Sequence, residues 1–295
     1  MQITDKPNID GNKYLAVTIG KFDGIHVGHE LLLSKVVAKE NEGLIPAALT
    51  FDMSEKHIYS DKERMSLFEK NGIDILIAYR FDDKLKNMSS EEFVKKILVD
   101  GLHAKYVCAG DDFRFGRNRE GDAEVLKKLG IKYGIEVEIV ERKKYDGDII
   151  SSSRVRTELE KGAVDKAACL LGRYYSVTGE VVYGNQIGRT IGFPTVNQKV
   201  SDEKSMPANG VYATRVVWNG KVYPSITNVG VKPTIEGKNE LGVETYIFDF
   251  DKKLYGETIT VEFIGFIRKE QKFESLDELK RQIEEDKEKA KAILL

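Results

Sequence analysis

The 295-residue chain contains few of the residues that build metal centres and disulfide frameworks. It has two cysteines and four histidines. Cys108 and Cys169 are far apart in the sequence and form no disulfide pattern, which is typical of proteins from a reducing cytosol. His57, His103 and the two cysteines also lack the spacing of zinc ligands. The composition therefore gives no support to a disulfide-rich secreted domain or a zinc-binding module.

The chain also lacks an excess of charge of either sign and any long apolar run. Its 46 basic and 48 acidic residues give a formal net charge of −2, so no basic stripe exists to neutralise a nucleic-acid backbone. No apolar run approaches the length of a membrane span, and residues 1–6 show neither the basic region nor the apolar core of a secretory leader. We expect a cytoplasmic protein that binds neither nucleic acid nor membrane. The residues allow an oligomer, but they do not indicate one.

The first half of the chain alternates two patterns. Short apolar runs rich in β-branched residues alternate with segments of helical period, which predicts a parallel sheet covered by helices. The expected strands are 14–19, 46–51, 73–79, 105–109 and 137–140, and the expected helices begin near residue 30 and cover 61–71, 89–99 and 163–171. The pattern changes near Gly172, so we place a first domain at 1–172.

The second half is dominated by strands and turns. Period-2 segments at 211–217 and 258–263, together with the Asn219-Gly220 dipeptide, predict the hairpins of a small closed barrel. A charged segment at 276–292 has the pattern of a terminal helix. We therefore expect a β-rich second domain at 173–295.

A glycine-rich segment at 20–29 follows the first expected strand and leads into a helix. At such a turn the backbone N–H groups and the helix dipole favour an anion, and Gly20, Gly24 and Gly28 let the backbone approach it closely. His26 and His29 lie three residues apart and can donate hydrogen bonds to phosphate oxygens. A metal pair would need a third ligand that the sequence does not supply, and a buried structural histidine would account for one of the two. Phosphate binding is the favoured interpretation.

A second unusual segment, 110–122, follows the expected strand at 105–109. It combines two aromatic rings, Phe113 and Phe115, with three arginines and three glycines. Rings and guanidinium groups suit a planar, phosphorylated ligand. The alternative is a solvated charged loop whose two rings are part of the core, and the residues alone do not decide between them.

A third segment, 150–159, begins with serines and continues with arginines. Ser151 and Ser152 offer hydroxyl and backbone donors at a helix start, while Arg154 and Arg156 add positive charge, so the segment could hold a leaving pyrophosphate. The alternative is an ordinary N-cap serine followed by surface arginines.

The second half contains a glycine-bearing turn at 184–192 that leads into an extended Pro-Thr-Val-Asn stretch. In a strand, Thr195 and Asn197 would point the same way, and their oxygens could coordinate a hard cation such as Mg²⁺ beside ATP phosphates. The alternative is a β-turn loop with polar edges.

Taken in chain order, these segments resemble the motifs of prokaryotic bifunctional riboflavin kinase/FAD synthetases. Gly-Lys-Phe-Asp-Gly-Ile-His-Val-Gly-His at 20–29, Gly-Asp-Asp-Phe-Arg-Phe-Gly at 110–116 and Ile-Ser-Ser-Ser-Arg-Val-Arg at 150–156 are similar to the adenylyltransferase half of that family. Gly-Arg-Thr-Ile-Gly-Phe-Pro-Thr-Val-Asn at 188–197 is similar to the riboflavin kinase motif G-R-T-x-G-F-P-T-A-N. Segments 228–234, 243–250 and 266–273 continue the likeness, which covers nearly the whole chain.

The resemblance implies a Rossmann-like nucleotidyltransferase domain with a parallel sheet, followed by a small β-barrel flavokinase domain with a terminal helix. It implies that riboflavin and ATP give FMN and ADP in the second domain, and that FMN and ATP give FAD and pyrophosphate in the first. Both steps would use Mg²⁺ to neutralise phosphate charge. An adenylyltransferase with an idle kinase half, and a flavin-binding regulatory protein, are the alternatives.

The resemblance also implies roles for individual residues. His26, His29 and Arg156 would stabilise charge during adenylyl transfer, and Glu244 would take the proton from the riboflavin 5′-hydroxyl. Thr195 and Asn197 would be metal ligands. The residues expected to bind ATP or phosphate are Gly20, Phe22, Asp23, Gly24, Gly28, Ser151, Ser152, Gly184, Gly188 and Arg189. The residues expected to bind flavin are Asp112, Phe113, Arg114, Phe115 and Arg268.

Three positions depart from the family pattern. Ser153 and Val155 stand where threonine and isoleucine are commoner, and they keep the hydroxyl and the β-branch. Val196 replaces an alanine beside the expected metal ligands. If its side chain faces the nucleotide, kinase activity would be weakened, whereas a side chain that faces the core would change nothing.

Overall fold

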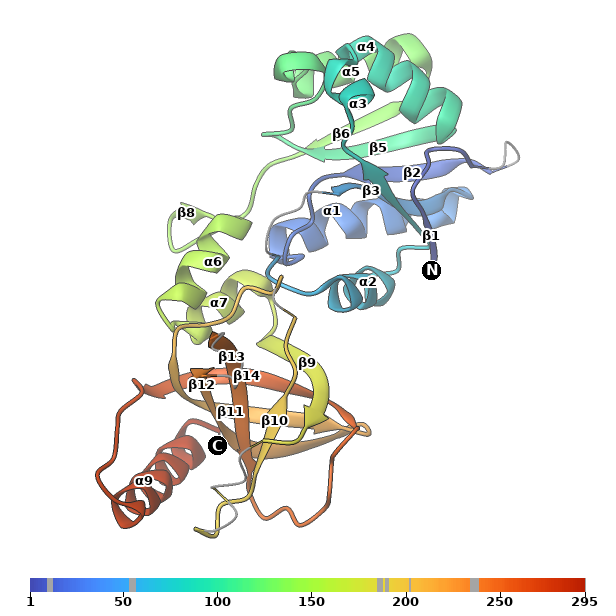
Figure 1. The fold of residues 1–295 in the computed structure, drawn as a ribbon. Helices are drawn as coiled ribbons and strands as arrows, with labels where there is room; N and C mark the ends of the chain where they lie inside the picture. Colours follow the sequence, from blue (N-terminus) through green and yellow to red (C-terminus); the bar gives the residue numbers. More distant parts are fainter. Residues whose placement is uncertain are drawn as a thin grey trace. The chain divides into compact units, whose positions relative to one another are not determined.

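The computed structural model describes residues 1–9, 13–52, 57–184, 188, 191–201, 203–233 and 239–294. The chain divides into two compact units, and each is described by itself (Figure 1). The first unit contains residues 1–55 and 61–151, and the second contains 56–60 and 152–295. The compact units divide after residue 151. The domain boundary expected near Gly172 stays a prediction.

The first unit is built on a six-stranded parallel sheet. Its strands in chain order are β1 (Gln2–Thr4), β2 (Leu15–Ile19), β3 (Ile45–Asp52), β4 (Ile75–Arg80), β5 (Ala104–Gly110) and β6 (Glu136–Val140). Their order in the sheet is β1-β4-β3-β2-β5-β6. From β2 the chain moves outward through β3 and β4, then returns to the other side of β2 for β5 and β6. This reversal makes the carboxyl ends of β2 and β5 the place where ligands collect in open parallel sheets.

Helices cover both faces of this sheet (Figure 1). On one face, α1 (Val27–Ala38) and α2 (Asp61–Lys70) enclose a core that includes Leu33 and Phe68. On the other face, α4 (Ser90–Glu92), the π-helix η2 (Phe93–Gly101) and α5 (Ala123–Tyr133) enclose a second core around Val94 and Leu126. The remaining short elements are η1 (Lys39–Glu42), α3 (Asp83–Asn87), η3 (Arg117–Arg119), β7 (Lys144–Tyr145) and β8 (Asp148–Ile149).

The strands and helices expected in this half are present, with one difference in kind. The helix expected at 89–99 begins with the Ser89–Glu92 capping box but continues as the π-helix, where Leu102 N donates to Ile97 O over 2.9 Å. A period-3.6 pattern does not distinguish an α-helix from this wider winding over nine residues. Strand β1 and helix α5 were not expected, and β1 is too short to show a pattern.

In the residues that the structure describes, the second unit is a closed six-stranded antiparallel barrel accompanied by helices. Its strands are β9 (Tyr175–Val182), β10 (Thr195–Gln198), β11 (Gly210–Trp218), β12 (Lys221–Pro233), β13 (Asn239–Ile247) and β14 (Thr258–Arg268), in the barrel order β10-β13-β12-β11-β14-β9. The helices are α6 (Ser152–Glu160), α7 (Val164–Leu171) and α9 (Leu276–Leu294). Asn219 and Gly220 have φ values of 48° and 72° and join β11 to β12, as a tight hairpin requires.

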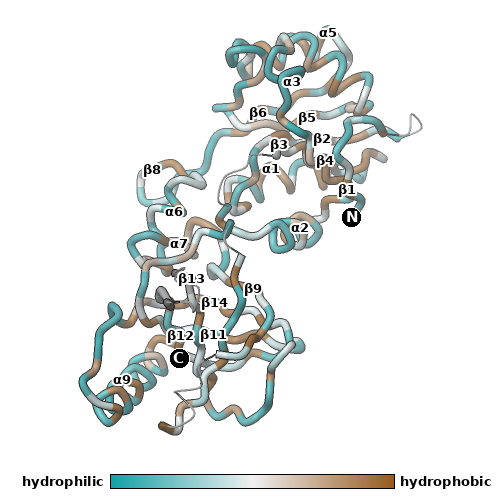
Figure 2. The backbone as a smooth tube through the Cα atoms, viewed as in Figure 1, coloured by the Kyte–Doolittle hydropathy of each residue, from teal (hydrophilic) through white to brown (hydrophobic). Residues whose placement is uncertain are grey.

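Helix α9 packs against the outside of the barrel. Its Ala290 and Ile283 join Val211, Ala213 and Ile226 in one hydrophobic cluster. Figure 2 shows α9 as a mixture of hydrophobic and hydrophilic residues, which suits a helix with one buried side. In the described residues no helix is both long and apolar enough to cross a membrane.

The barrel interior contains a chain of buried hydroxyl groups. Thr214 Oγ1 lies 2.8 Å from both Ser225 Oγ and Thr227 Oγ1, and Thr227 Oγ1 lies 2.9 Å from Thr245 Oγ1. All four residues are fully buried. Each hydroxyl has a hydrogen-bond partner on a neighbouring strand, so the network links β11, β12 and β13 and stabilises the register in which they pair.

We expect Thr227→Val to destabilise the second unit by about 1–3 kcal/mol, because it leaves two buried hydroxyls each short of a partner. Trp218 is the only tryptophan and ends β11, so its fluorescence during urea unfolding reports on the barrel. Thr178→Val is the control. Thr178 is exposed, its hydroxyl lies 2.9 Å from Thr260 Oγ1, and its loss should change the free energy of unfolding by at most about 0.5 kcal/mol. Equal effects of the two substitutions would contradict the prediction.

Candidate active sites

The turn after β2 is compact and strained. Phe22 and Ile25 have φ values of 48° and 43°, and both side chains are fully buried. A positive φ is costly for a bulky or β-branched residue and persists only where the surroundings impose it. Gly24, between them, has a φ of 79°. Phe22, expected to bind nucleotide, thus has its ring in the core, while Gly20, Asp23 and Gly28 lie in or beside the turn.

His26 and His29 are brought together at the start of α1. His26 is the N-cap, and its Nδ1 accepts from the backbone N–H of His29 at 3.3 Å. The two rings stack with centroids 3.7 Å apart and 11° between their planes. A Cβ on Gly28 would lie 3.2 Å from the His26 ring, so glycine leaves room for this stack. The imidazole pair thus lies beside the first backbone N–H groups of a twelve-residue helix, a position that favours an anion.

Neighbouring elements hold the turn in place. The Lys21 carbonyl accepts from Thr50 Oγ1 at 3.2 Å and from an Arg64 terminal nitrogen at 3.4 Å. The Phe22 ring meets Phe68 of α2 edge to face, with centroids 5.5 Å apart. Sequence reasoning missed Arg64, since an arginine on an amphipathic helix gives no signal of its own.

The loop after β5 lies at the end of the strand next to β2. Phe115 is 6% exposed and belongs to the core, whereas Phe113 packs over it with ring centroids 5.2 Å apart. Arg114 is exposed, and its guanidinium donates to the Phe113 carbonyl at 2.9 Å. The core placement expected as the alternative therefore holds for Phe115. Its direct contact with flavin stays a prediction.

Two acidic residues of this loop are held by an arginine that sequence reasoning missed. Arg142, just after β6, donates to Asp111 at 2.7 Å and lies 3.4 Å from Asp112. At the far end of the loop, Asp122 caps α5 through the Val125 backbone N–H, and this hydrogen bond lowers the pKa of its carboxyl group. The loop is thus anchored at both ends.

The serine-arginine segment divides between the units. Ser151 is the last residue of the first unit, and Ser152 and Arg156 belong to α6 in the second. Their expected role in holding pyrophosphate stays a prediction.

Cys108 of β5 is not a candidate nucleophile or metal ligand. It is fully buried, and burial raises the pKa of its thiol to about 12. The thiolate that either role requires is therefore scarce at neutral pH.

In the barrel, strand register places the expected kinase residues in one row. Asn197 of β10 pairs with Glu244 of β13, and Glu244 pairs with Asn228 of β12. Asn228 in turn pairs with Val211 of β11, which pairs with Arg268 of β14. Residues directly opposite each other on paired strands share a face of the sheet. One face of five adjacent strands therefore carries all of them.

Two glycines of the turn at 184–192 lie next to the residues of this row. Thr195 Oγ1 donates to Glu244 Oε1 at 2.5 Å. A Cβ on Gly184 would overlap the Asn197 side-chain amide, and a Cβ on Gly188 would lie 3.3 Å from Thr195 Oγ1. Both glycines thus lie against the expected metal ligands. Arg189 lies outside the described residues.

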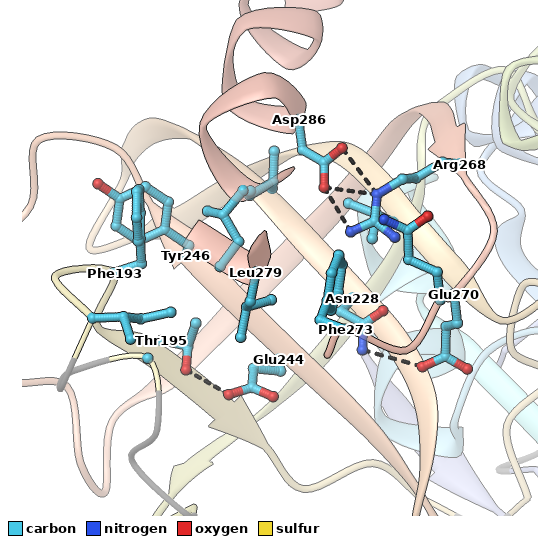
Figure 3. Close-up of a pocket in the computed structure, with 16 residues that line it drawn as sticks. Phe193, Thr195, Asn228, Glu244, Tyr246, Arg268, Glu270, Phe273, Leu279 and Asp286 are labelled. Carbon is cyan, nitrogen blue, oxygen red and sulfur yellow. Dashed lines mark hydrogen bonds and ion pairs between the residues drawn. The ribbon is translucent and has the colours of Figure 1, made fainter. Parts of the chain in front are cut away.

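A pocket of about 360 Å³ opens over this row, between the barrel and α9 (Figure 3). Its walls are largely apolar and aromatic, and Glu244, Asn228 and Arg268 are among its polar groups. The lining residues include Ile191, Phe193, Thr195, Ile226, Tyr246, Glu270, Phe273, Leu279 and Asp286. A flat, mostly apolar ligand with polar ends fits such a site.

Val196 lies on the other side of its strand from the pocket row. It pairs with Thr245, whose side chain is fully buried in the barrel hydroxyl network. Side chains alternate along a strand, so Val196 faces away from Glu244 and Asn197. The register therefore favours the interpretation in which this departure from the family pattern leaves the kinase unaffected.

The donor set around Thr195 suits magnesium rather than a softer metal. The Thr195 hydroxyl, the Asn197 amide and the Glu244 carboxylate offer hard oxygen atoms on adjacent strands. Within the described ranges, no group of three or more histidine, cysteine, aspartate or glutamate side chains could hold a metal by itself. A cation here would share its coordination with substrate phosphates.

Comparison with known proteins assigns a class to each half. A family model described as FAD synthetase matches residues 9–154, and one described as riboflavin kinase matches residues 171–294. The half with the parallel sheet and the half with the barrel are thus the two domains of an enzyme that combines FAD synthetase and riboflavin kinase.

Relatives that span the chain are more specific. A bifunctional riboflavin kinase/FMN adenylyltransferase of Haemophilus influenzae is 37% identical over 94% of this chain and 93% of its own. The protein of the same name from Escherichia coli K12 is 36% identical over 92% and 90%. This chain therefore belongs to the bifunctional riboflavin kinase/FMN adenylyltransferase family.

A solved structure shows the same fold across the whole chain. A Streptococcus pneumoniae protein described as a macrolide-efflux protein superposes with a TM-score of 0.89 at 32% identity, and 98% of each chain is covered.

We expect Val196→Ala to leave the riboflavin kinase rate within about twofold of the unsubstituted protein, because the side chain faces the barrel interior. It should instead lower the free energy of unfolding of the barrel by about 1 kcal/mol, the cost of two lost methyl groups. FMN production and Trp218 fluorescence during urea unfolding measure the two effects. A large rise in kinase rate with unchanged stability would place the side chain toward the nucleotide.

Proposed function

We propose that riboflavin is phosphorylated in the pocket of the barrel, with Glu244 as the general base. We propose that the resulting FMN is adenylylated at the turn after β2. The observation that supports this is the placement of one distinct catalytic set in each half. The Thr195–Glu244 pair lies in the pocket of the barrel, and the stacked His26–His29 pair lies at the start of α1. The product of the first step is the substrate of the second.

In the kinase step, Glu244 acts as the general base. The hydrogen bond from Thr195 holds its carboxylate at one edge of the pocket row, where it can accept the proton of the riboflavin 5′-hydroxyl as that oxygen attacks the γ-phosphorus of ATP. The apolar and aromatic walls hold the flavin ring and exclude water from the reacting atoms. Gly184 and Gly188 let the turn approach the ATP phosphates.

Thr195 and Asn197 would hold the Mg²⁺ that accompanies ATP. The ion would neutralise charge on the phosphates during transfer. Register places both side chains on the face of Glu244, so the cation on ATP and the base on riboflavin would act at the same phosphoryl transfer.

In the adenylyl transfer, the N-terminus of α1 and its two histidines act on ATP. The FMN phosphate attacks the α-phosphorus, and pyrophosphate leaves. Donors fixed at the helix start stabilise the charge that develops on the phosphate oxygens, and no covalent intermediate with the protein is needed. The strained turn supports this role, since its surroundings hold it in one conformation before substrate binds.

The other expected roles complete the proposal. Phe113, Arg114 and Asp112 would contact the flavin nucleotide, and Ser151, Ser152 and Arg156 the pyrophosphate. We place both reactions in the cytoplasm, where riboflavin and ATP are available, in agreement with the expectation from composition.

We expect Glu244→Gln to lower the rate of FMN formation by about 10²–10⁴-fold, because the amide cannot accept the proton. Formation of FAD from supplied FMN should not change. Incubation with ATP, Mg²⁺ and either riboflavin or FMN, followed by chromatography of the flavins, measures both rates. Glu180→Gln, which changes an exposed glutamate of β9, is the matched control. Equal loss of both activities in Glu244→Gln would contradict separate sites.

We expect the reverse pattern for His29→Ala. Loss of a preorganised donor at the phosphates should lower FAD formation from FMN by about 10²–10³-fold, while FMN formation from riboflavin persists. His103→Asn is the control, because His103 precedes β5, at the end of the parallel strands opposite to the turn after β2, and its φ of 48° suits asparagine. Unchanged FAD formation in His29→Ala would remove the histidine pair from the mechanism.

A further inference from the structure

Asp286 of α9 is a buried carboxylate with no assigned role. Its side chain is 1% exposed, and it pairs with Arg268 at the end of β14. Arg268 Nε lies 3.0 and 2.9 Å from the two carboxylate oxygens, and Nη2 lies 2.8 Å from Oδ2. A buried charge of this kind is costly unless its partner is held in good geometry. The pair therefore fixes one edge of the Arg268 guanidinium.

This pairing determines which N–H groups of Arg268 remain available to a ligand. A guanidinium has five N–H groups. Asp286 takes the one on Nε and one on Nη2, and the Lys269 carbonyl accepts from Nη1 at 3.0 Å. Among the described residues, the second N–H on each terminal nitrogen has no acceptor. Figure 3 shows Arg268 and Asp286 together at the wall of the pocket that both residues line.

Asp286 is itself held by a hydrogen-bonded chain that reaches the loop over the pocket. Gln282, one turn earlier on α9, donates to Asp286 Oδ1 at 3.1 Å. Gln271 of the loop donates to Gln282 Oε1 at 3.0 Å. The same loop places the Phe273 ring 5.7 Å from the Arg268 guanidinium. The loop, the helix and the last barrel strand thus meet at this carboxylate.

Arg268 lies far from the chemical step. Along the pocket row it is three strands from Glu244, through Asn228 and Val211. Three strand spacings correspond to about 14 Å measured along the curved sheet, so the two residues lie at separate ends of the pocket row. A group at that distance from the base contacts the part of the substrate that does not react, and its contribution to binding is equal in the ground state and the transition state.

We propose that Asp286 is a positioning residue of the riboflavin kinase site. It orients Arg268 so that the two remaining N–H groups bind acceptor atoms of the flavin, and with Gln282 and Gln271 it holds the covering loop against α9. The inference rests on the proposed kinase function of the barrel.

The test is a double-mutant cycle on the full-length protein with Asp286→Asn, Arg268→Lys and both together. We expect Asp286→Asn to raise the KM for riboflavin by about 10–100-fold, the cost of leaving a buried donor poorly paired, and to change kcat by less than about threefold. The double variant should resemble Arg268→Lys alone, because Asp286 acts through that side chain. FAD formation from FMN in the same preparations should not change.

Asp277→Asn is the matched control, since it makes the same change at an exposed position of α9. Gln282→Leu is a milder variant that keeps the Arg268–Asp286 pair and removes the hydrogen bonds that join Gln282 to Asp286 and to Gln271. It should raise the riboflavin KM by about threefold to tenfold and settles the question if Asp286→Asn does not fold.

Three results would overturn the inference. They are additive effects of the two substitutions, a fall in kcat without a change in KM, and behaviour of Asp286→Asn that matches Asp277→Asn. Absence of FMN formation by the unsubstituted protein would instead refute the proposed kinase function, so the two failures are distinguishable.

Discussion

The register of the barrel strands is the constraint on which the kinase site depends. Because side chains alternate along each strand, one pairing scheme sends Thr245 and Thr227 inward and Glu244 and Asn228 outward. A shift of one residue between β12 and β13 would exchange these faces, exposing the hydroxyl network and burying the Glu244 carboxylate. The interior hydroxyls therefore do more than fill the barrel, since they specify the register that sets the pocket row.

A comparable constraint operates in the parallel sheet, through strand order instead of register. Only the return of the chain from β4 to the far side of β2 makes the segments after β2 and β5 neighbours. The turn after β2 then adopts its strained conformation because α2 and β3 hold it, through Phe68, Arg64 and Thr50. In the first half, regular strands thus hold an irregular turn that contains the expected phosphate-binding residues, whereas in the barrel the expected residues lie on the strands themselves.

Local patterns along the chain predicted most of the elements well. The buried strand of β2, the helix start at residue 89 and the Asn219-Gly220 hairpin all follow from near neighbours in the sequence. The π-helical winding of 93–101 and the short edge strand β1 did not follow, because their hydrogen bonds carry no distinctive residue pattern. The unexpected residues Arg64, Arg142 and Asp286 share one property. Each acts through a partner that is distant in sequence, and a single charged residue on a helix or loop does not reveal that partner.

The sequence alone determined the two domain types, the order of the motifs and the identity of most candidate groups, since each motif is a local run of residues with its own chemistry. Tertiary structure decided which of these groups meet. It placed Phe115 in the core and Phe113 above it, turned Val196 toward the barrel interior, and paired Arg268 with Asp286 at the wall of the pocket. The physical reason is that facing, burial and pairing depend on contacts between segments far apart in the chain. Those contacts exist only after the strands have taken their order and register.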